Sequence, residues 1–292
     1  MSSDHQIVDK AVKLSLVELV IGSTVHALHI PLAGQILSIN QGFMLTRFQK
    51  GIESRISVSK MVMEVSSVAS LMKALAPVGK KLGPMISISM QGFLYMLGVL
   101  SFGKNLLGQM VGMALLSPWA FIQPLVTYFV IYGKDFTKAF DYFASKNEMI
   151  YDFILFAIIA KAVVCACVPL ILYLLPEEKI TRLEQKLEKA STPKARKQNA
   201  GSPTMSAFLE LFRPMFLLSV LLMISFFLIS GESGISIFWK VMRAFAVAFS
   251  IFYIARNTYV HSFVAKIAKK NKFIQRLYEL SAQASKRITN LQ

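Results

Sequence analysis

Residues 82–103 decide the fold class of this chain, and they read LGPMISISMQGFLYMLGVLSFG. None of these 22 residues is charged. A helix needs about 20 predominantly apolar residues to cross the hydrocarbon core of a bilayer. The stretch therefore predicts a membrane-spanning helix.

The composition of the whole chain extends this prediction to the rest of the fold. Of the 292 residues, 54% are hydrophobic and only 16% are charged, and the mean hydropathy is +0.53. Soluble proteins average about 25% charged residues. A soluble enzyme of this size would expose more polar surface than this chain has, and a disordered chain is also excluded. The composition predicts an all-α, polytopic helical membrane protein.

Other uncharged or nearly uncharged segments are long enough to form spans, and some of them are interrupted. They are 19–46, 105–133, 149–175 and the pair 214–230 and 235–255. Pro31 and Gly34 divide the first into a helix over about 14–30, a turn at 30–34 and a second helix to about 45. The last pair flanks the tight turn 231–234 and predicts a two-span hairpin.

Residues 105–133 contain Pro118 and Pro124, and their 29 residues fit either one tilted span or two short ones. The distribution of Lys and Arg favours two spans, because cytoplasmic loops carry the excess of these residues. With the hairpin turn outside, a double crossing places 25 cationic residues inside and four outside. We therefore expect a reversal near Ser117–Pro118–Trp119, six short or broken spans, a C-terminal two-span hairpin, and both termini in the cytoplasm.

The same pattern predicts the domain organisation. The parts are a six-span domain at 1–176 with an amphipathic insertion at 47–81, a cytoplasmic basic linker at 177–213, a transmembrane hairpin at 214–256, and a basic amphipathic tail at 257–292. Apolar residues of 56–76 recur at helical spacing, which is typical of a helix on the membrane surface or against a partner. The tail has a similar pattern, so it either lies on lipid or docks on a cytoplasmic partner.

Polar residues gather inside the apolar runs of the first domain. The strings 35–41 and 87–91 each lead into a Gln-Gly-Phe motif, and 119–123 is a weaker echo. Amides and hydroxyls buried in hydrocarbon cost free energy unless they are hydrogen-bonded. They therefore either bind a polar ligand or bond neighbouring helices to one another. The predicted ligand-binding residues are His26, His29, Gln35, Ser38, Asn40, Gln41, Ser87, Ser89, Gln91, Trp119 and Gln123.

The sequence offers little for catalysis or cofactor binding. His26 and His29 lie on one helix face, but two histidines alone are a weak metal signal, so we expect ligand contact and no metal. An intramembrane enzyme that uses these histidines would need a further partner. No nucleotide-binding motif is present, so we expect no ATPase activity and no cofactor in this chain. The net charge is +16. The Lys and Arg residues lie between apolar runs, where we expect them to orient the helices and to contact anionic lipid headgroups rather than nucleic acid.

The run from Ile30 to Gln41, IPLAGQILSINQ, resembles the loop after the first helix in the substrate-binding components of energy-coupling-factor vitamin transporters, with the biotin-binding branch nearest. The resemblance covers about 1–176. It implies a six-helix protein of a bacterial inner membrane, with both ends cytoplasmic. It also implies a vitamin or precursor as small-molecule ligand, and a cytoplasmic ATPase or membrane coupling subunit as partner. Ala195-Arg196-Lys197 and Ala255-Arg256-Asn257 are similar to the short docking motifs of the coupling subunits.

The chain also departs from that family. Residues 11–27 lack the Ala-x-x-x-Ala pair that docks the family's first helix, and the insertion and the extra hairpin are unusual. We expect a substrate-binding membrane subunit of a vitamin-type importer, with the ligand against 30–41 and with 87–91 and 119–123 opposite. The alternative is a non-catalytic structural or assembly subunit of a larger membrane complex.

Overall fold

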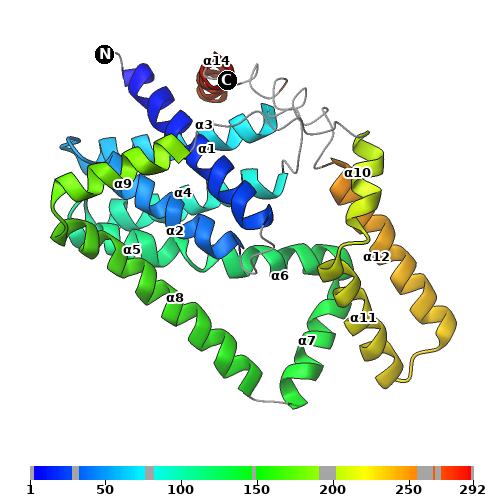
Figure 1. Ribbon diagram of the computed structural model, residues 1–292. Coiled ribbons are helices and arrows are strands. Elements are labelled where there is room, and N and C mark those ends of the chain that lie inside the picture. Colours follow the sequence, from blue (N-terminus) through cyan, green and yellow to red (C-terminus); the bar gives the residue numbers. More distant parts are fainter. Residues whose placement is uncertain are drawn as a thin grey trace.

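The computed structural model describes residues 3–27, 33–75, 82–146, 149–190, 202–254, 266 and 271–290. Throughout these residues the regular structure is helical and no strand occurs. The helices are α1 (Ser3–Ala27), α2 (Ala33–Phe48), α3 (Arg55–Leu75), α4 (Leu82–Phe102), α5 (Leu106–Leu116), α6 (Trp119–Tyr132), α7 (Lys134–Lys146), α8 (Met149–Leu174), α9 (Glu177–Ala190), α10 (Pro203–Glu210), α11 (Pro214–Ile229), α12 (Gly234–Ile254) and α14 (Lys272–Asn290) (Figure 1). The predicted all-α class is confirmed.

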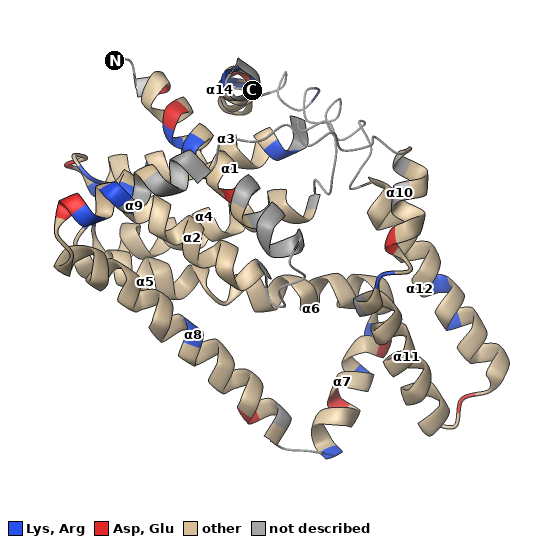
Figure 2. Cartoon of the chain, viewed as in Figure 1, with Lys and Arg blue, Asp and Glu red and all other residues tan. Residues whose placement is uncertain are grey.

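Within the described residues, four helical segments are long and apolar enough to cross a membrane. They are Gly83–Phe102, Leu106–Tyr132, Tyr151–Leu174 and Gly234–Ile254. A shorter apolar helix covers Phe216–Ile229. Figure 2 shows α4, α5, α6 and α11 free of charged residues along their described lengths. The molecule is therefore compatible with a multi-pass membrane protein.

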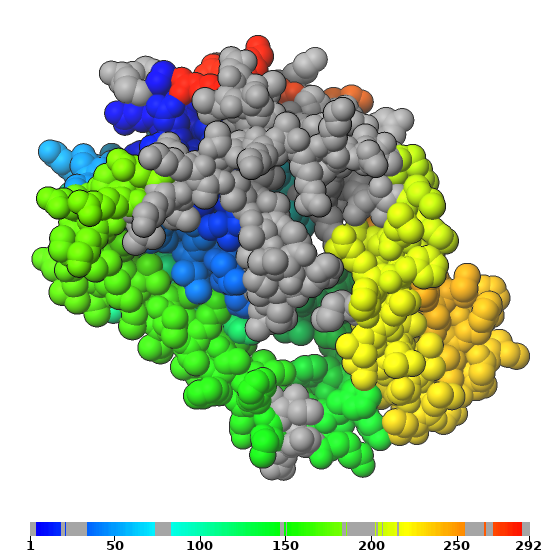
Figure 3. All heavy atoms as spheres, viewed as in Figure 1, coloured from blue at the N-terminus to red at the C-terminus, as the bar shows by residue number. Residues whose placement is uncertain are grey.

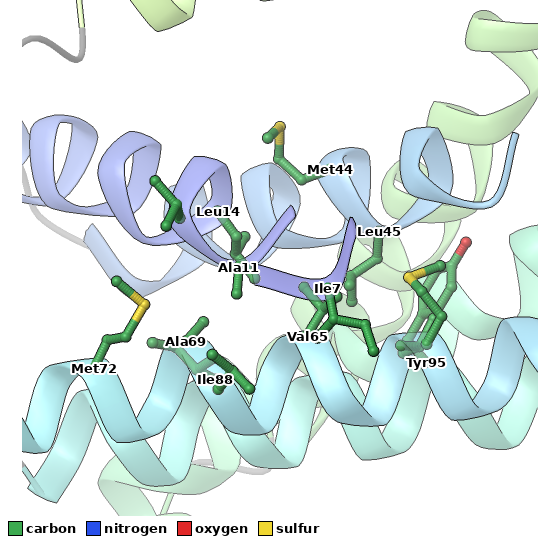
Figure 4. Close-up of a cluster of buried hydrophobic side chains, with 14 of the residues drawn as sticks. Ile7, Ala11, Leu14, Met44, Leu45, Val65, Ala69, Met72, Ile88 and Tyr95 are labelled. Atoms are coloured by element: carbon green, nitrogen blue, oxygen red, sulfur yellow. The ribbon is translucent and has the colours of Figure 1, made fainter. Parts of the chain in front are cut away.

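The amphipathic segment predicted at 56–76 lies, as far as residue 75, in α3 at the centre of a core. Val58, Val62, Val65 and Val68 of α3 are fully buried, and α3 contacts α1, α4 and α14. Figure 4 shows side chains of α1, α2, α3 and α4 meeting in this core, with Leu45, Val65 and Tyr95 among them. The sequence predicted that this apolar face lies on a membrane surface or against a partner. In the structure it packs against other helices of the same chain.

Successive helices α1 to α4 run antiparallel, and their ends are joined by polar contacts. At one end these contacts are Lys10 Nζ to Phe48 O at 2.9 Å, Lys104 Nζ to Ile52 O at 3.2 Å, and Arg47 Nη2 to Glu177 Oε1 at 2.8 Å. Toward the other end, Ser70 Oγ donates to Met85 O at 2.9 Å, and Gln123 Nε2 donates to Gly83 O at 2.9 Å. The start of α9 therefore lies beside the end of α2.

Residues 105–133 do not reverse direction at Pro118, contrary to our expectation from the charges. Gly108, near the start of α5, adjoins Gly103 at the end of α4, whereas Gln123 reaches Gly83 at its start. The segment thus runs antiparallel to α4 from Gly108 to Gln123, and the rest of α6 continues past the start of α4 to the second core. Ser117 and Pro118 both keep right-handed helical backbone angles. A proline removes one amide donor, which bends a helix without turning it back, and counting charges cannot detect this difference.

Glycines allow α4 and α5 to cross closely. A Cβ atom on Gly98 would lie 2.3 Å from the backbone nitrogen of Gly112, and one on Gly112 would lie 2.9 Å from Tyr95 O. The sequence pair Gly108 and Gly112 belongs to the small-residue spacing that lets helices approach closely. Here that spacing serves packing within the chain.

A second core joins α6, α7, α11 and α12 around Phe216, Phe226, Phe227 and Ala248. Figure 3 shows α11 and α12, yellow to orange, along one edge of the molecule and α9, light green, at the opposite edge. The helices α11 and α12 occupy the predicted hairpin, and Gly231 has a φ of 71° in its turn. Of the predicted linker, 191–201 lies outside the described residues; α9 and α10 flank this gap.

The described part of the basic tail, α14, packs on the first core. Leu277, Leu280 and Ala284 are buried, and α14 contacts α1 and α3 (Figure 1). Arg276 pairs with Glu64 of α3 at 2.8 Å and with Asp4 of α1 at 2.6 Å. The sequence predicted that this amphipathic helix lies on lipid or on a soluble partner. In the structure its apolar face instead covers helices of the same chain.

Candidate functional site

The main candidate site surrounds Lys161, in the middle of the apolar helix α8. Its Nζ donates to Ser38 Oγ of α2 at 2.9 Å and to Ser117 O after α5 at 2.9 Å. It also donates to Gln35 Oε1 of α2. The side chain thus joins three helices. An ionisable residue at the centre of a span costs roughly 2.5–3.5 kcal/mol on insertion scales, and such residues usually serve a function.

Local geometry explains why these oxygens are available to Lys161. Gln35 and Ser38 are three residues apart on α2, so they share one face of the helix. At Pro118 the helix tightens, because the Phe121 amide donates to Pro118 O at 2.9 Å, one residue short of the usual α-helical acceptor. The usual acceptor is Ser117 O, and it binds Lys161 instead.

The surroundings of Lys161 are polar but uncharged. Within the described part of the chain, no Asp or Glu forms an ion pair with it. The ring of Phe121 lies 5.4 Å from Nζ, a distance at which the ring face attracts a cation. The ammonium therefore has neutral oxygens and one aromatic ring as neighbours, and the buried thiol of Cys165, one turn farther along α8, also interacts with it.

The two Gln-Gly-Phe motifs lie at helix crossings. Gln41 Nε2 donates to Ile88 O of α4 at 2.8 Å. A Cβ on Gly42 would lie 2.1 Å from Met113 Sδ of α5, and one on Gly92 would lie 2.2 Å from Ser66 Oγ of α3. The glycines therefore serve close packing. Of the two roles that the sequence left open for these strings, interhelical bonding accounts for the Gln41 amide.

The remaining described candidates of the predicted site are dispersed. Gln91 Nε2 donates to Ser87 Oγ within α4 at 3.0 Å, and Gln123 binds Gly83 O. Ser89 is partly exposed on α4. Among the predicted residues whose side chains the structure describes, Gln35 and Ser38 are the two that hydrogen-bond to Lys161 through their side chains.

Three predicted residues carry buried polar atoms that have no partner among the described residues. These atoms are Asn40 Nδ2, Gln41 Oε1 and Trp119 Nε1. Buried polar groups are normally hydrogen-bonded, so each of these is open to a ligand or a water molecule. Trp119 stands between Ser117 and Phe121 in sequence, and both of those contact Lys161.

Two predicted residues cannot be placed. His29 and the turn at 30–32 lie outside the described residues, and so does the side chain of His26, although its backbone belongs to α1. Among the residues that are described, no group of three or more His, Cys, Asp or Glu side chains is arranged to hold a metal ion.

Two polar features were not predicted from the sequence: the contacts of Lys161 and a second polar cluster around Tyr95. Tyr95 of α4 is fully buried, its hydroxyl lies 2.9 Å from Thr46 Oγ1, and Gln49 Nε2 donates to it at 2.5 Å. A tyrosine in an apolar span needs a hydrogen-bond partner for its hydroxyl, so the position of Tyr95 in the run 82–103 could have indicated this cluster. Lys161 is the one charged residue in the run 153–175, and this isolation could have indicated that it has polar partners on other helices.

A pocket of about 290 Å³ lies away from these residues, between α6, α7 and α11. Its walls include Tyr128, Phe136, Phe143 and Met223. Its Tyr132 and Ser219 hydroxyls lie 2.8 Å apart and bond to each other. This pocket therefore offers an apolar surface and does not contain any of the predicted ligand-binding residues.

Comparison with known proteins adds no assignment, since no family model, curated protein or solved structure matches this chain.

Proposed function

We propose that this chain is the substrate-binding membrane subunit of a vitamin-type importer, similar to the substrate-binding components of energy-coupling-factor transporters. The observation that carries the proposal is the Lys161 cluster. It brings Gln35 and Ser38 of the resembling segment together with Ser117, next to the string 119–123. Sites of this kind form where polar groups of several broken or bent helices converge within the membrane.

The arrangement of the first helices supports the same proposal. We propose that α4, the bent pair α5–α6 and α8 cross the membrane, with α1, α2 and α3 packed beside them. The start of α1 and the start of α9 then lie at the same end of the bundle. The pairing of Glu177 with Arg47 and the bond from Lys10 to Phe48 support it. The pair α11–α12 would then add the two-span hairpin.

The energy for import would come from a separate ATPase, directly or through a membrane coupling subunit, in a bacterial inner membrane. We place its docking surface at the end of the bundle that holds Glu177, Lys50 and Lys104, with both termini on the same cytoplasmic side. The polar contacts that join α2, α9 and the α4–α5 connection support this choice.

The test is native mass spectrometry of the detergent-solubilised chain, followed by a thermal-shift screen of vitamins and their precursors. We expect one small molecule to remain bound or to raise the unfolding temperature. Replacement of Ser38 by Ala should weaken that binding, and Ser145→Ala on the exposed part of α7 should not. If nothing is retained and no compound of the screen binds, the proposal fails.

A structural subunit of a larger membrane complex is the second candidate. It is favoured by the fact that all three protons of Lys161 already have acceptors within the chain. The same mass spectra separate the two candidates. Stable partners without ATPase activity, in the absence of any small molecule, would favour the structural role.

A further inference from the structure

The pocket between α6, α7 and α11 has walls that suit an apolar ligand. Figure 1 shows α7 and α11 side by side near the end of α6. The pocket residues of α7 are at positions 136, 139, 140, 143 and 144, which is the spacing of one helix face. Another face of α7 carries the exposed charges of Lys134, Lys138 and Asp141. None of the residues that line the pocket is charged.

Two of the hydroxyls in the walls of this pocket are occupied by the chain itself. Ser219 Oγ donates to Phe216 O at 2.7 Å, so the Tyr132 hydroxyl donates its own proton to Ser219 Oγ, 2.8 Å away. Neither hydroxyl keeps a proton for a ligand. The rings of Tyr128 and Phe136 stack with their centroids 6.3 Å apart, which joins the walls contributed by α6 and α7. Apolar cavities exclude water and take up apolar molecules, so a hydrocarbon group fits this pocket better than a polar molecule.

The mouth of the pocket opens onto an apolar surface. Leu218 and Leu222 of α11 line the pocket, and yet 50% and 49% of these residues are exposed, so they form its rim. Their neighbours Leu217 and Leu221 on α11 and Phe129 on α6 are exposed as well. The helix α6 belongs to a segment that is long and apolar enough to cross a membrane. In a membrane such a surface contacts the hydrocarbon chains of lipids, so these chains are the molecules that meet the mouth of the pocket.

The size of the pocket and the position of α7 narrow the choice of occupant. A volume of about 290 Å³ is small for a partner helix, which is about 10 Å across, but it admits a single hydrocarbon chain. The helix α7 connects the end of the apolar segment Leu106–Tyr132 to the start of Tyr151–Leu174. An amphipathic helix at the ends of two spans turns its charged face to the headgroups and its apolar face to the acyl chains.

We propose that this pocket holds one acyl chain of a membrane lipid. The chain is recognised by its fit between the aromatic rings of α6 and α7 and the leucines of α11. The headgroup charge is not recognised, because no charged residue lines the pocket. This inference does not depend on the importer proposal, since a structural subunit would hold the lipid in the same way.

The test uses the full-length chain in lipid nanodiscs. The probe is phosphatidylcholine or phosphatidylglycerol with a photoreactive diazirine in the middle of one acyl chain. After illumination, mass spectrometry of peptides locates the labelled residues. We expect the labels to concentrate on the pocket residues of α7 and α11 with both lipids. The reference is Phe156, which is 69% exposed on α8 and represents a lipid contact outside the pocket.

Two variants of adjacent residues on α11 test the location of the site. Leu222→Trp places a larger side chain at the rim of the pocket, and Leu221→Trp adds the same side chain outside it. Excluding about two methylene groups of a chain from an apolar site weakens its binding roughly tenfold. We therefore expect Leu222→Trp to lower the pocket labels by about that factor relative to Phe156. Leu221→Trp should leave the ratio unchanged.

Three results would overturn the inference. Equal labelling of Phe156 and the pocket would mean that the pocket is ordinary lipid-facing surface. Labelling of the pocket by phosphatidylglycerol alone would mean that the headgroup charge is recognised instead of the chain. An unlabelled pocket would mean that another molecule or a partner protein fills it. If Leu222→Trp does not fold, Ala139→Leu, which reduces the pocket from the side of α7, replaces it, and the label distribution in the natural chain decides without any variant.

Discussion

At the scale of single residues, the structure depends on polar groups that find partners inside an apolar bundle. The hydroxyl of Tyr95 shows this, because it lies between Thr46 and Gln49 and is fully buried. Replacing Tyr95 by Phe leaves the Gln49 amide without its shortest acceptor. We expect a loss of about 1–2 kcal/mol in the free energy of unfolding, measured by denaturant titration in detergent. Tyr173→Phe, on an exposed part of α8, should change it little, and equal effects of the two variants would contradict this account.

At the scale of secondary-structure elements, close crossings and helix ends determine the arrangement. Gly98 lies against the backbone of Gly112, so a larger side chain would force α4 and α5 apart. We expect Gly98→Val to lower the free energy of unfolding by about 3 kcal/mol or more. Gly34→Ala is the control, since a Cβ there meets nothing within 4 Å. Unchanged thermal unfolding of Gly98→Val would show that the helices do not cross at this glycine.

The junction of α2 with α9 makes a prediction about pH. Hydrogen bonds from Arg47 and Lys50 lower the pKa of Glu177 from 4.5 to about 2. A carboxyl whose pKa is lower in the folded state stabilises the protein above its unfolded pKa, and this contribution is lost as the pH falls through the folded value. The stability difference between the natural chain and Glu177→Gln should therefore be constant above about pH 4.5 and disappear toward pH 2. A difference that grows on acidification would contradict the pairing.

The same elements show how far the sequence predicts the structure. Long apolar runs with few or no charges predicted α4, α8 and α12, because their length and high hydropathy are sufficient to indicate such helices. The course of 105–133 was not predictable from charges, since it depends on how far Pro118 bends a helix that packs on α4. Gln35 and Ser38 were recognised as buried polar groups. Their partner was not, because Lys161 lies more than 120 residues away and only tertiary packing brings it near.

At the scale of the whole molecule, the first and the last of the described helices, α1 and α14, contact each other. Arg276 of α14 pairs with Glu64, whose side chain is only 3% exposed, and with Asp4. Arg276→Ala would leave Glu64 buried without this partner, so we expect a loss of about 1–3 kcal/mol in the free energy of unfolding. Lys272→Ala, exposed on the same helix, is the matched control. Thermal unfolding should separate the two variants; similar curves would mean that α14 does not hold the first core together.

The bend at Pro118 has a consequence for how this protein tolerates mutation. Ser117 accepts the hydrogen bond from Lys161 with its backbone carbonyl, so replacing the Ser117 side chain by Ala would not remove this contact. The residue that controls this oxygen is its neighbour. In Pro118→Ala the new amide of residue 118 gains Ala114 O as its helical acceptor, the carbonyl that the Ser117 hydroxyl now binds at 3.0 Å, so the turn that directs Ser117 O to Lys161 is free to become regular helix. Selection at this site would therefore act on a proline that makes no polar side-chain contact of its own.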